Sequence, residues 1–175
     1  PTDTLDDCGN VNAGITGGGV ATGASYDFGN GFSTAIGYQS TDGEESKGLM
    51  TEESTDSYAL NAAYTGDSFG ASVTYGNIED GANGNDTYTA LNGSFTPDSE
   101  SLPSISVGYE IGDDDSKSTD EEITSFFVGL QWDEVGPGAL GIAMGHSNTV
   151  EGTDEEYMYE AYYSYPVNDG MTITP

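Results

Sequence analysis

The connections between successive strand-like segments alternate in length along this chain. The short connections are residues 27–31, 66–68, 96–103, 133–138 and 166–170. The long connections lie between them, at residues 41–55, 79–86, 112–122 and 148–156. The segments between them alternate apolar and polar residues, which is the two-residue period of a β-strand. Short turns at one rim and long loops at the other are typical of a transmembrane β-barrel, and a soluble sandwich has no reason to separate its connections in this way. The pattern therefore predicts an all-β, antiparallel, up-and-down transmembrane barrel.

The number of strands sets the expected extent of this barrel. We predict nine strands and the start of a tenth at Met171. A sheet that spans lipid leaves no open edge, so these strands are expected to be part of a larger barrel. Residues 13–175 are assigned to the barrel domain, and residues 1–12 to an acidic linker or partial loop that precedes it.

The charge of the chain is strongly one-sided, with 31 acidic residues, two lysines and a net charge of −29. Phosphate binding needs clustered Lys and Arg, so a nucleic-acid partner is excluded. Most of the acid lies in the four long connections, as do Lys47 and Lys117. Such runs are ordinarily just solvated surface, but their confinement to one rim fits loops that project into water beyond a membrane. Self-repulsion of this size also favours a high-salt medium, which keeps a marine or halophilic source open.

The two faces of the predicted strands differ in kind. Five apolar residues are expected to face lipid, namely Phe69, Val73, Val107, Leu130 and Ile142. Their neighbours on the opposite face are small or polar: Gly70, Thr74, Gly108, Gln131 and Gly141. Aromatic residues border both sets of connections, as in the girdles that sit at lipid headgroups. The girdle at the long loops is predicted to contain Tyr38, Tyr58, Tyr75, Tyr88, Tyr109, Tyr157 and Tyr159.

Two acidic residues, Glu110 and Glu160, are predicted to be the only ones inside strands, and both share the phase of the small residues. A carboxylate on the lipid face is costly near the midplane, so both are candidates for the pore lining, where they would attract cations. The chain has one histidine, His146, and one cysteine, Cys8. No His-based metal site, catalytic triad or internal disulfide can be built from these, so neither an enzyme nor a cofactor is expected.

The acidic loops raise one further question, which is whether they bind divalent cations. Asp113, Asp114 and Asp115 offer consecutive oxygen ligands for weak Ca²⁺ or Mg²⁺ binding. The alternative interpretation is a solvated loop tip.

The C-terminal segment 157–175 resembles a late hairpin of cyanobacterial outer-membrane porins, which are relatives of the carbohydrate-selective, OprB-like porins. The resemblance rests on Glu160, on Tyr162 and Tyr163, and on the runs Val-Asn-Asp-Gly at 167–170 and Thr-Ile-Thr-Pro at 172–175. Residues 57–76 resemble an internal porin hairpin more loosely. The resemblance implies a diffusion channel of about sixteen strands that forms an oligomer, by resemblance a trimer. The arginine side of a porin constriction is missing from this sequence.

These observations predict a porin of the cell outer membrane that passes small hydrophilic solutes and ions and prefers cations. Its expected partners are outer-membrane lipid and lipopolysaccharide. The alternative is a secreted, acidic, soluble all-β surface or binding module from a marine or halophilic organism. A protein that partitions with outer membranes would favour the first reading, and a detergent-independent soluble protein the second.

Overall fold

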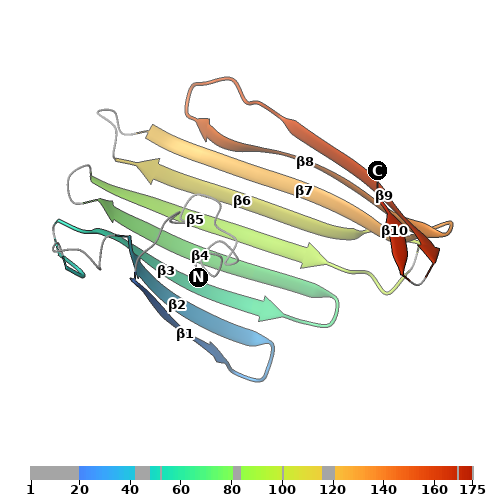
Figure 1. Cartoon of the computed structure of the whole chain (residues 1–175), viewed down its shortest axis with the longest axis horizontal. Coiled ribbons are helices and arrows are strands. Elements are labelled where there is room, and N and C mark those ends of the chain that lie inside the picture. The colour runs from blue at the N-terminus through green and yellow to red at the C-terminus, as the bar shows by residue number, and fades with distance from the viewer. Residues whose placement is uncertain are drawn as a thin grey trace.

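The computed structural model describes residues 20–41, 48–51, 53–80, 84–99, 101–115, 121–168 and 170–174. The predicted linker 1–12 therefore lies outside the described residues. Ten strands account for most of the described chain (Figure 1). They are β1 (Val20–Asp27), β2 (Phe32–Ser40), β3 (Thr55–Thr65), β4 (Phe69–Asp80), β5 (Gly84–Phe95), β6 (Ser104–Asp114), β7 (Glu121–Val135), β8 (Gly138–Val150), β9 (Met158–Asn168) and β10 (Met171–Ile173).

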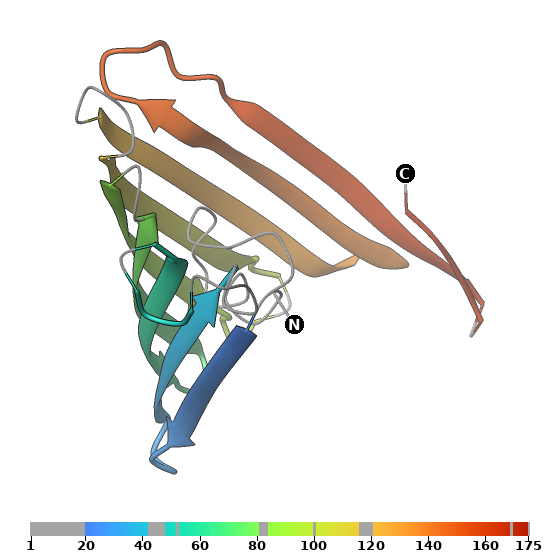
Figure 2. The same ribbon diagram turned by 60° about the vertical axis from the view of Figure 1, so that its left-hand side comes forward.

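The strands form a single sheet in the order β1 to β10, and each pair of neighbours is antiparallel. The predicted all-β, up-and-down meander is thereby confirmed. Figure 2 shows that the sheet is bent into an open trough rather than lying flat. No helix in the described part of the chain is long and apolar enough to cross a membrane.

The register divides the sheet into an apolar face and a polar face. Val73, Leu91 and Tyr109 lie side by side on β4, β5 and β6 and belong to the apolar face. The polar face carries their chain neighbours Thr74, Ala90 and Glu110, which are also aligned across the three strands. Large side chains of the apolar face remain exposed, as with Leu60 at 53% and Leu91 at 53%. An exposed apolar surface of this extent marks a place where a membrane, a ligand or another protein makes contact.

Aromatic side chains cluster at both ends of the apolar face. At the short-turn end, Tyr64 contacts Phe32 at a ring separation of 4.8 Å and Phe69 at 5.0 Å. At the long-loop end, Tyr38 and Tyr58 lie 5.3 Å apart. The predicted girdle is wrong in one member, because Tyr88 is aligned with Gly112 and belongs to the polar face, where it is 6% exposed. Its position at a strand end is as predicted, but the phase of β5 directs its ring to the other side.

The predicted long connection at 79–86 is also wrong. Strand β4 runs to Asp80 and β5 begins at Gly84, with Glu79 paired to Asn85. For the same reason Glu110 and Glu160 are not the only acidic residues inside strands; Asp56 and Asp113 are others. Pairing satisfies the backbone wherever two strands are adjacent, so the ladder continues into water beyond the apolar band. Charged residues at a strand end therefore indicate that this part of the strand lies in water, and they do not show that the strand has ended.

The segment that leads into β3 is pinned by a buried carboxylate. Asp56, 1% exposed, accepts a hydrogen bond of 2.6 Å from the Tyr38 hydroxyl and one of 2.7 Å from Ser54 Oγ. The Ser54 hydroxyl also bonds to Thr51, and the Ser54 N–H donates to the Thr51 carbonyl at 3.2 Å. Asp56 therefore fixes the described end of the β2–β3 connection against the sheet.

Candidate functional site

Glu110 and Glu160 both lie on the polar face, in the phase that the sequence predicted. Glu110 of β6 is aligned with Ala90 on one side and Ser125 on the other. Glu160 of β9 is aligned with Ala143 of β8. These small neighbours leave room above the backbone for a long acidic side chain at either position.

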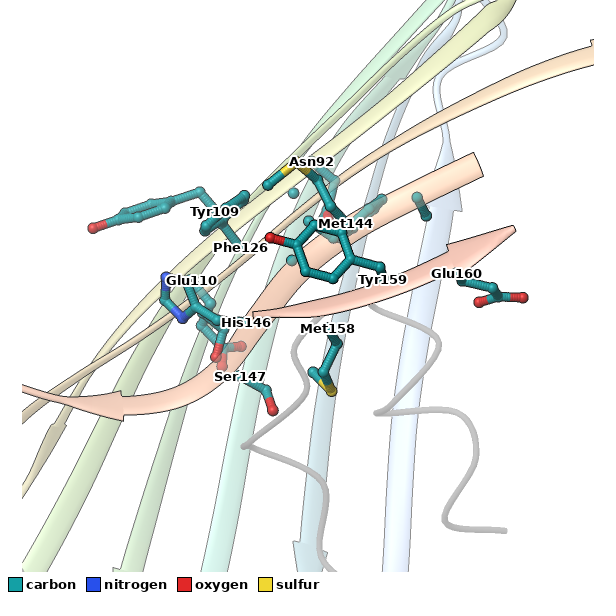
Figure 3. Close-up of a pocket in the computed structure, with 15 residues that line it drawn as sticks. Asn92, Tyr109, Glu110, Phe126, Met144, His146, Ser147, Met158, Tyr159 and Glu160 are labelled. Carbon is teal, nitrogen blue, oxygen red and sulfur yellow. The ribbon is translucent and has the colours of Figure 1, made fainter. Parts of the chain in front are cut away.

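The two carboxylates differ in their surroundings although both line one cavity of about 500 Å³. Glu110 is 4% exposed and makes its own polar interaction within the protein, whereas Glu160 is exposed. Asn92 and Met158 also line the cavity (Figure 3). Phe127 is a further lining residue. The Glu160 carboxylate is therefore accessible to water and dissolved ions, whereas the Glu110 carboxylate is enclosed by protein.

Irregular strand pairing creates this cavity. The β7–β8 register shifts between Thr124 and Phe126, where Ser147 and Asn148 of β8 lie opposite the single residue Ser125 of β7, so the extra residue is on β8. On the other side, the described pairing of β8 with β9 begins at Gly145 and Met158, although β8 continues to Val150 against β7. The two strands therefore fork at the long-loop end, and the cavity opens there.

His146 lies at this fork and also lines the cavity. Its ring packs against Phe126 at 4.7 Å and lies 5.9 Å from Tyr157, and its Nδ1 lies 2.9 Å from Thr149 Oγ1. His146 therefore belongs to an aromatic cluster at the long-loop end. Among the described residues, no group of three His, Cys, Asp or Glu side chains is arranged to hold a metal ion.

A second, smaller cavity of about 230 Å³ adjoins Glu160 from the short-turn side. Ser104, Ser106, Gln131 and Tyr162 are among its lining residues. Glu160 therefore lies where a largely apolar cavity meets a more polar one.

Three aromatic rings on the polar face were missed by the sequence interpretation. Each lies over a glycine of a neighbouring strand, so that a Cβ at that glycine would overlap the ring: Tyr88 over Gly112, Phe127 over Gly108, and Tyr162 over Gly141. Their orientation could have been predicted from the alternation of residues along each strand. An aromatic residue that is out of phase with the apolar residues of its strand must point to the polar face.

One tyrosine outside the strands, Tyr157, has a raised pKa. Tyr157 donates a hydrogen bond to the Glu155 carboxylate, and that bond raises the pKa of the Tyr157 phenol, with smaller contributions from burial and from the negative charge of Glu155. A carboxylate acceptor favours the neutral, proton-bearing phenol over the phenolate. This pair lies in the connection between β8 and β9, beside the fork.

A sheet of this kind, with an exposed apolar face, aromatic ends and a polar face that carries carboxylates over small residues, has the two surfaces that a channel wall requires. Searches of curated proteins and of solved structures gave no match. A family model described as Gram-negative porin matches residues 2–174, which is almost the whole chain. The chain belongs to the family of Gram-negative porins.

Proposed function

We propose that this chain forms the wall of a water-filled diffusion channel in the outer membrane, and that the channel prefers cations. Membership of the porin family supports the channel and its location. The observation that carries the cation preference is Glu160, an exposed carboxylate on the polar face. The two lysines of the sequence, Lys47 and Lys117, lie outside the described residues, so no described residue is a Lys or Arg that would offset it.

The selectivity would arise from wall charge and channel width rather than from chemistry. A carboxylate in a narrow aqueous passage raises the local concentration of cations, and the acidic long-loop end adds a wider field of the same sign. Salt shortens the reach of both, to about 10 Å at 0.1 M ionic strength. The preference is therefore expected to be strongest in dilute salt. Glu110 contributes less in this proposal, because it is buried.

Three finer features are part of the proposal. The apolar face would contact lipid, with lipopolysaccharide at the rim of the long loops. The protein would assemble as a trimer, as the resemblance to cyanobacterial OprB-like porins implies. The same resemblance adds sugars to the proposed solutes, and weak Ca²⁺ or Mg²⁺ binding by the acidic loops remains a hypothesis.

The secreted, soluble alternative finds little support. Phe32, Ile36, Leu60 and Phe69 are each more than half exposed on one face. A soluble monomer rarely leaves so large an apolar surface in water.

Reversal potentials in planar bilayers across a KCl gradient test the proposal. The wild-type channel should show the sign of a cation-preferring pore. Glu160→Gln should lower the cation/anion permeability ratio, and Glu110→Gln should lower it less. Glu134→Gln is the matched control, because Glu134 is an exposed carboxylate of β7 near a short turn. An anion-preferring wild type, or a ratio that E160Q leaves unchanged, would refute the proposed selectivity.

A further inference from the structure

Consecutive polar-face positions of β9 carry three different kinds of side chain. Met158, Glu160 and Tyr162 follow one another at every second residue, so each is about 6.6 Å further along the strand. Figure 3 shows Met158 and Glu160 on one side of β9 and Tyr159 on the other. A thioether, a carboxylate and a phenol ring thus form one line on the wall.

Phe127 faces the same space from β7. It is aligned with Gly145, which is aligned in turn with Met158, so the two residues lie at one level on the two strands that flank β8, with the Phe127 ring over Gly108 of β6. Phe127 is 45% exposed and Met158 57% exposed, and both line the larger cavity together with Glu160. The apolar part of the cavity and its exposed carboxylate are therefore open to a solute at the same time.

We propose that Glu160, Phe127, Met158 and Tyr162 form a recognition site for organic ammonium cations that carry an apolar body. This inference rests on the proposed channel function and names the class of solute that the wall selects. The ammonium group would bind the Glu160 carboxylate, and the apolar body would lie against Phe127 and Met158. The Tyr162 ring would lie on the other side of the charged group.

The chemistry of these groups favours an amine over other solutes. A carboxylate forms charge-assisted hydrogen bonds with an ammonium donor. Aromatic faces attract cations, and a thioether packs readily against varied apolar shapes. A hydrated potassium ion gains only the electrostatic attraction and none of the packing against the aromatic ring and the thioether.

A sugar or an anion fits the site less well. Sugar hydroxyls act as donors and acceptors, whereas an ionised carboxylate only accepts. An anion would need Lys or Arg, and no residue of either type occurs in the described part of the chain. The cavity of about 500 Å³ also has the size of a site for a small organic molecule.

Block of single-channel current tests the inference with phenethylammonium as the probe and potassium as the carried ion. The purified protein is reconstituted in planar bilayers, and the probe is titrated on the long-loop side. The wild type should show concentration-dependent block. Glu160→Gln should raise the half-blocking concentration about tenfold, which corresponds to about 1.4 kcal/mol. Phe127→Leu should raise it several-fold.

Two matched controls separate the site from general effects. Phe95→Leu makes the same change at a ring that is 47% exposed on the apolar face, and should leave the block unchanged. Phenethyl alcohol has nearly the same shape without the charge, and should block only weakly.

The outcomes distinguish the inference from the function on which it rests. A channel that conducts but is not blocked by the amine, or whose block survives E160Q, overturns the site and leaves the channel intact. Equal block by glucose or by phenethyl alcohol overturns the assignment to cations. Absence of any conductance overturns the channel itself, and the site with it.

Discussion

Tyr162 of β9 reaches across strand β8 and donates a hydrogen bond of 3.0 Å from its hydroxyl to Oε1 of Gln131 on β7. The ring can make this crossing because Gly141, the residue of β8 beneath it, has no side chain. The bond therefore links two strands that do not pair with each other. The polar face gains in this way a connection that the backbone ladder does not provide.

Gly141→Ala is expected to destabilise the sheet by about 1–3 kcal/mol, because the new methyl group would overlap the Tyr162 ring and force it from its position. Urea unfolding in detergent micelles measures the loss. Gly129→Ala is the control, since a Cβ at that polar-face glycine meets only Ala143 and Ser106, at 4.0 Å each. Equal stability of the two variants would show that the ring is not held against Gly141.

Asp56→Ala is expected to release the connection before β3. The substitution removes two hydrogen bonds to a buried carboxylate, each worth about 1.5–3 kcal/mol. Limited proteolysis of the folded protein should then cut faster between residues 48 and 54. Asp67→Ala removes an exposed carboxylate in a short turn and serves as the control. An unchanged cleavage rate in D56A would contradict the pinning role of Asp56.

Val107 and Ser106 are expected to contact different phases, because neighbouring residues of a strand point to opposite faces. Each is replaced by Cys in a background in which Cys8 is Ser, and is labelled with a fluorophore. A lipid-soluble quencher should quench the label at Val107, and a water-soluble quencher the label at Ser106. The reverse result would exchange the two faces of the sheet.

Removal of the Glu155 carboxylate is expected to lower the pKa of Tyr157 towards its ordinary value of about 10. Because folding raises this pKa, the stabilisation is fully present below the pKa of the unfolded chain and is lost as the pH rises through that of the folded protein. Phenolate absorbance reports the titration, with the Y157F titration subtracted to isolate one tyrosine among 12. Glu151→Gln, an exposed carboxylate in the same connection, is the control. No difference between E155Q and the wild type would contradict the hydrogen bond as the cause.

The architecture was predictable from the sequence because the two-residue period and the turn residues are local signals. Asp27 shows this well: its carboxylate caps the turn by accepting a hydrogen bond of 2.7 Å from the Gly29 N–H, and Gly29 and Gly31 both adopt positive φ. Val73, Val107 and Ile142 are exposed on the apolar face for the same local reason. The phase of Glu110 and Glu160 followed from counting residues.

The rest depended on neighbours across the sheet. Glu110 and Glu160 look equivalent in the sequence, yet only the structure shows that one is buried and the other exposed. The bulge in β8 opposite Ser125 and the fork after Gly145 arise from pairing between strands, so the sequence of a single strand does not predict them. Tyr88 was misplaced because an aromatic residue at a strand end was assigned to the girdle without regard to its phase.

The order β1 to β10 means that each strand bonds only with its neighbours in the chain. Loss or duplication of a whole hairpin therefore leaves adjacent strands running in opposite directions, whereas loss of a single strand would bring two parallel strands together. Barrel diameter grows with strand number. Duplication or deletion of a hairpin in the gene can therefore change the diameter of the encoded barrel by two strands at a time, and the order of the remaining strands stays the same.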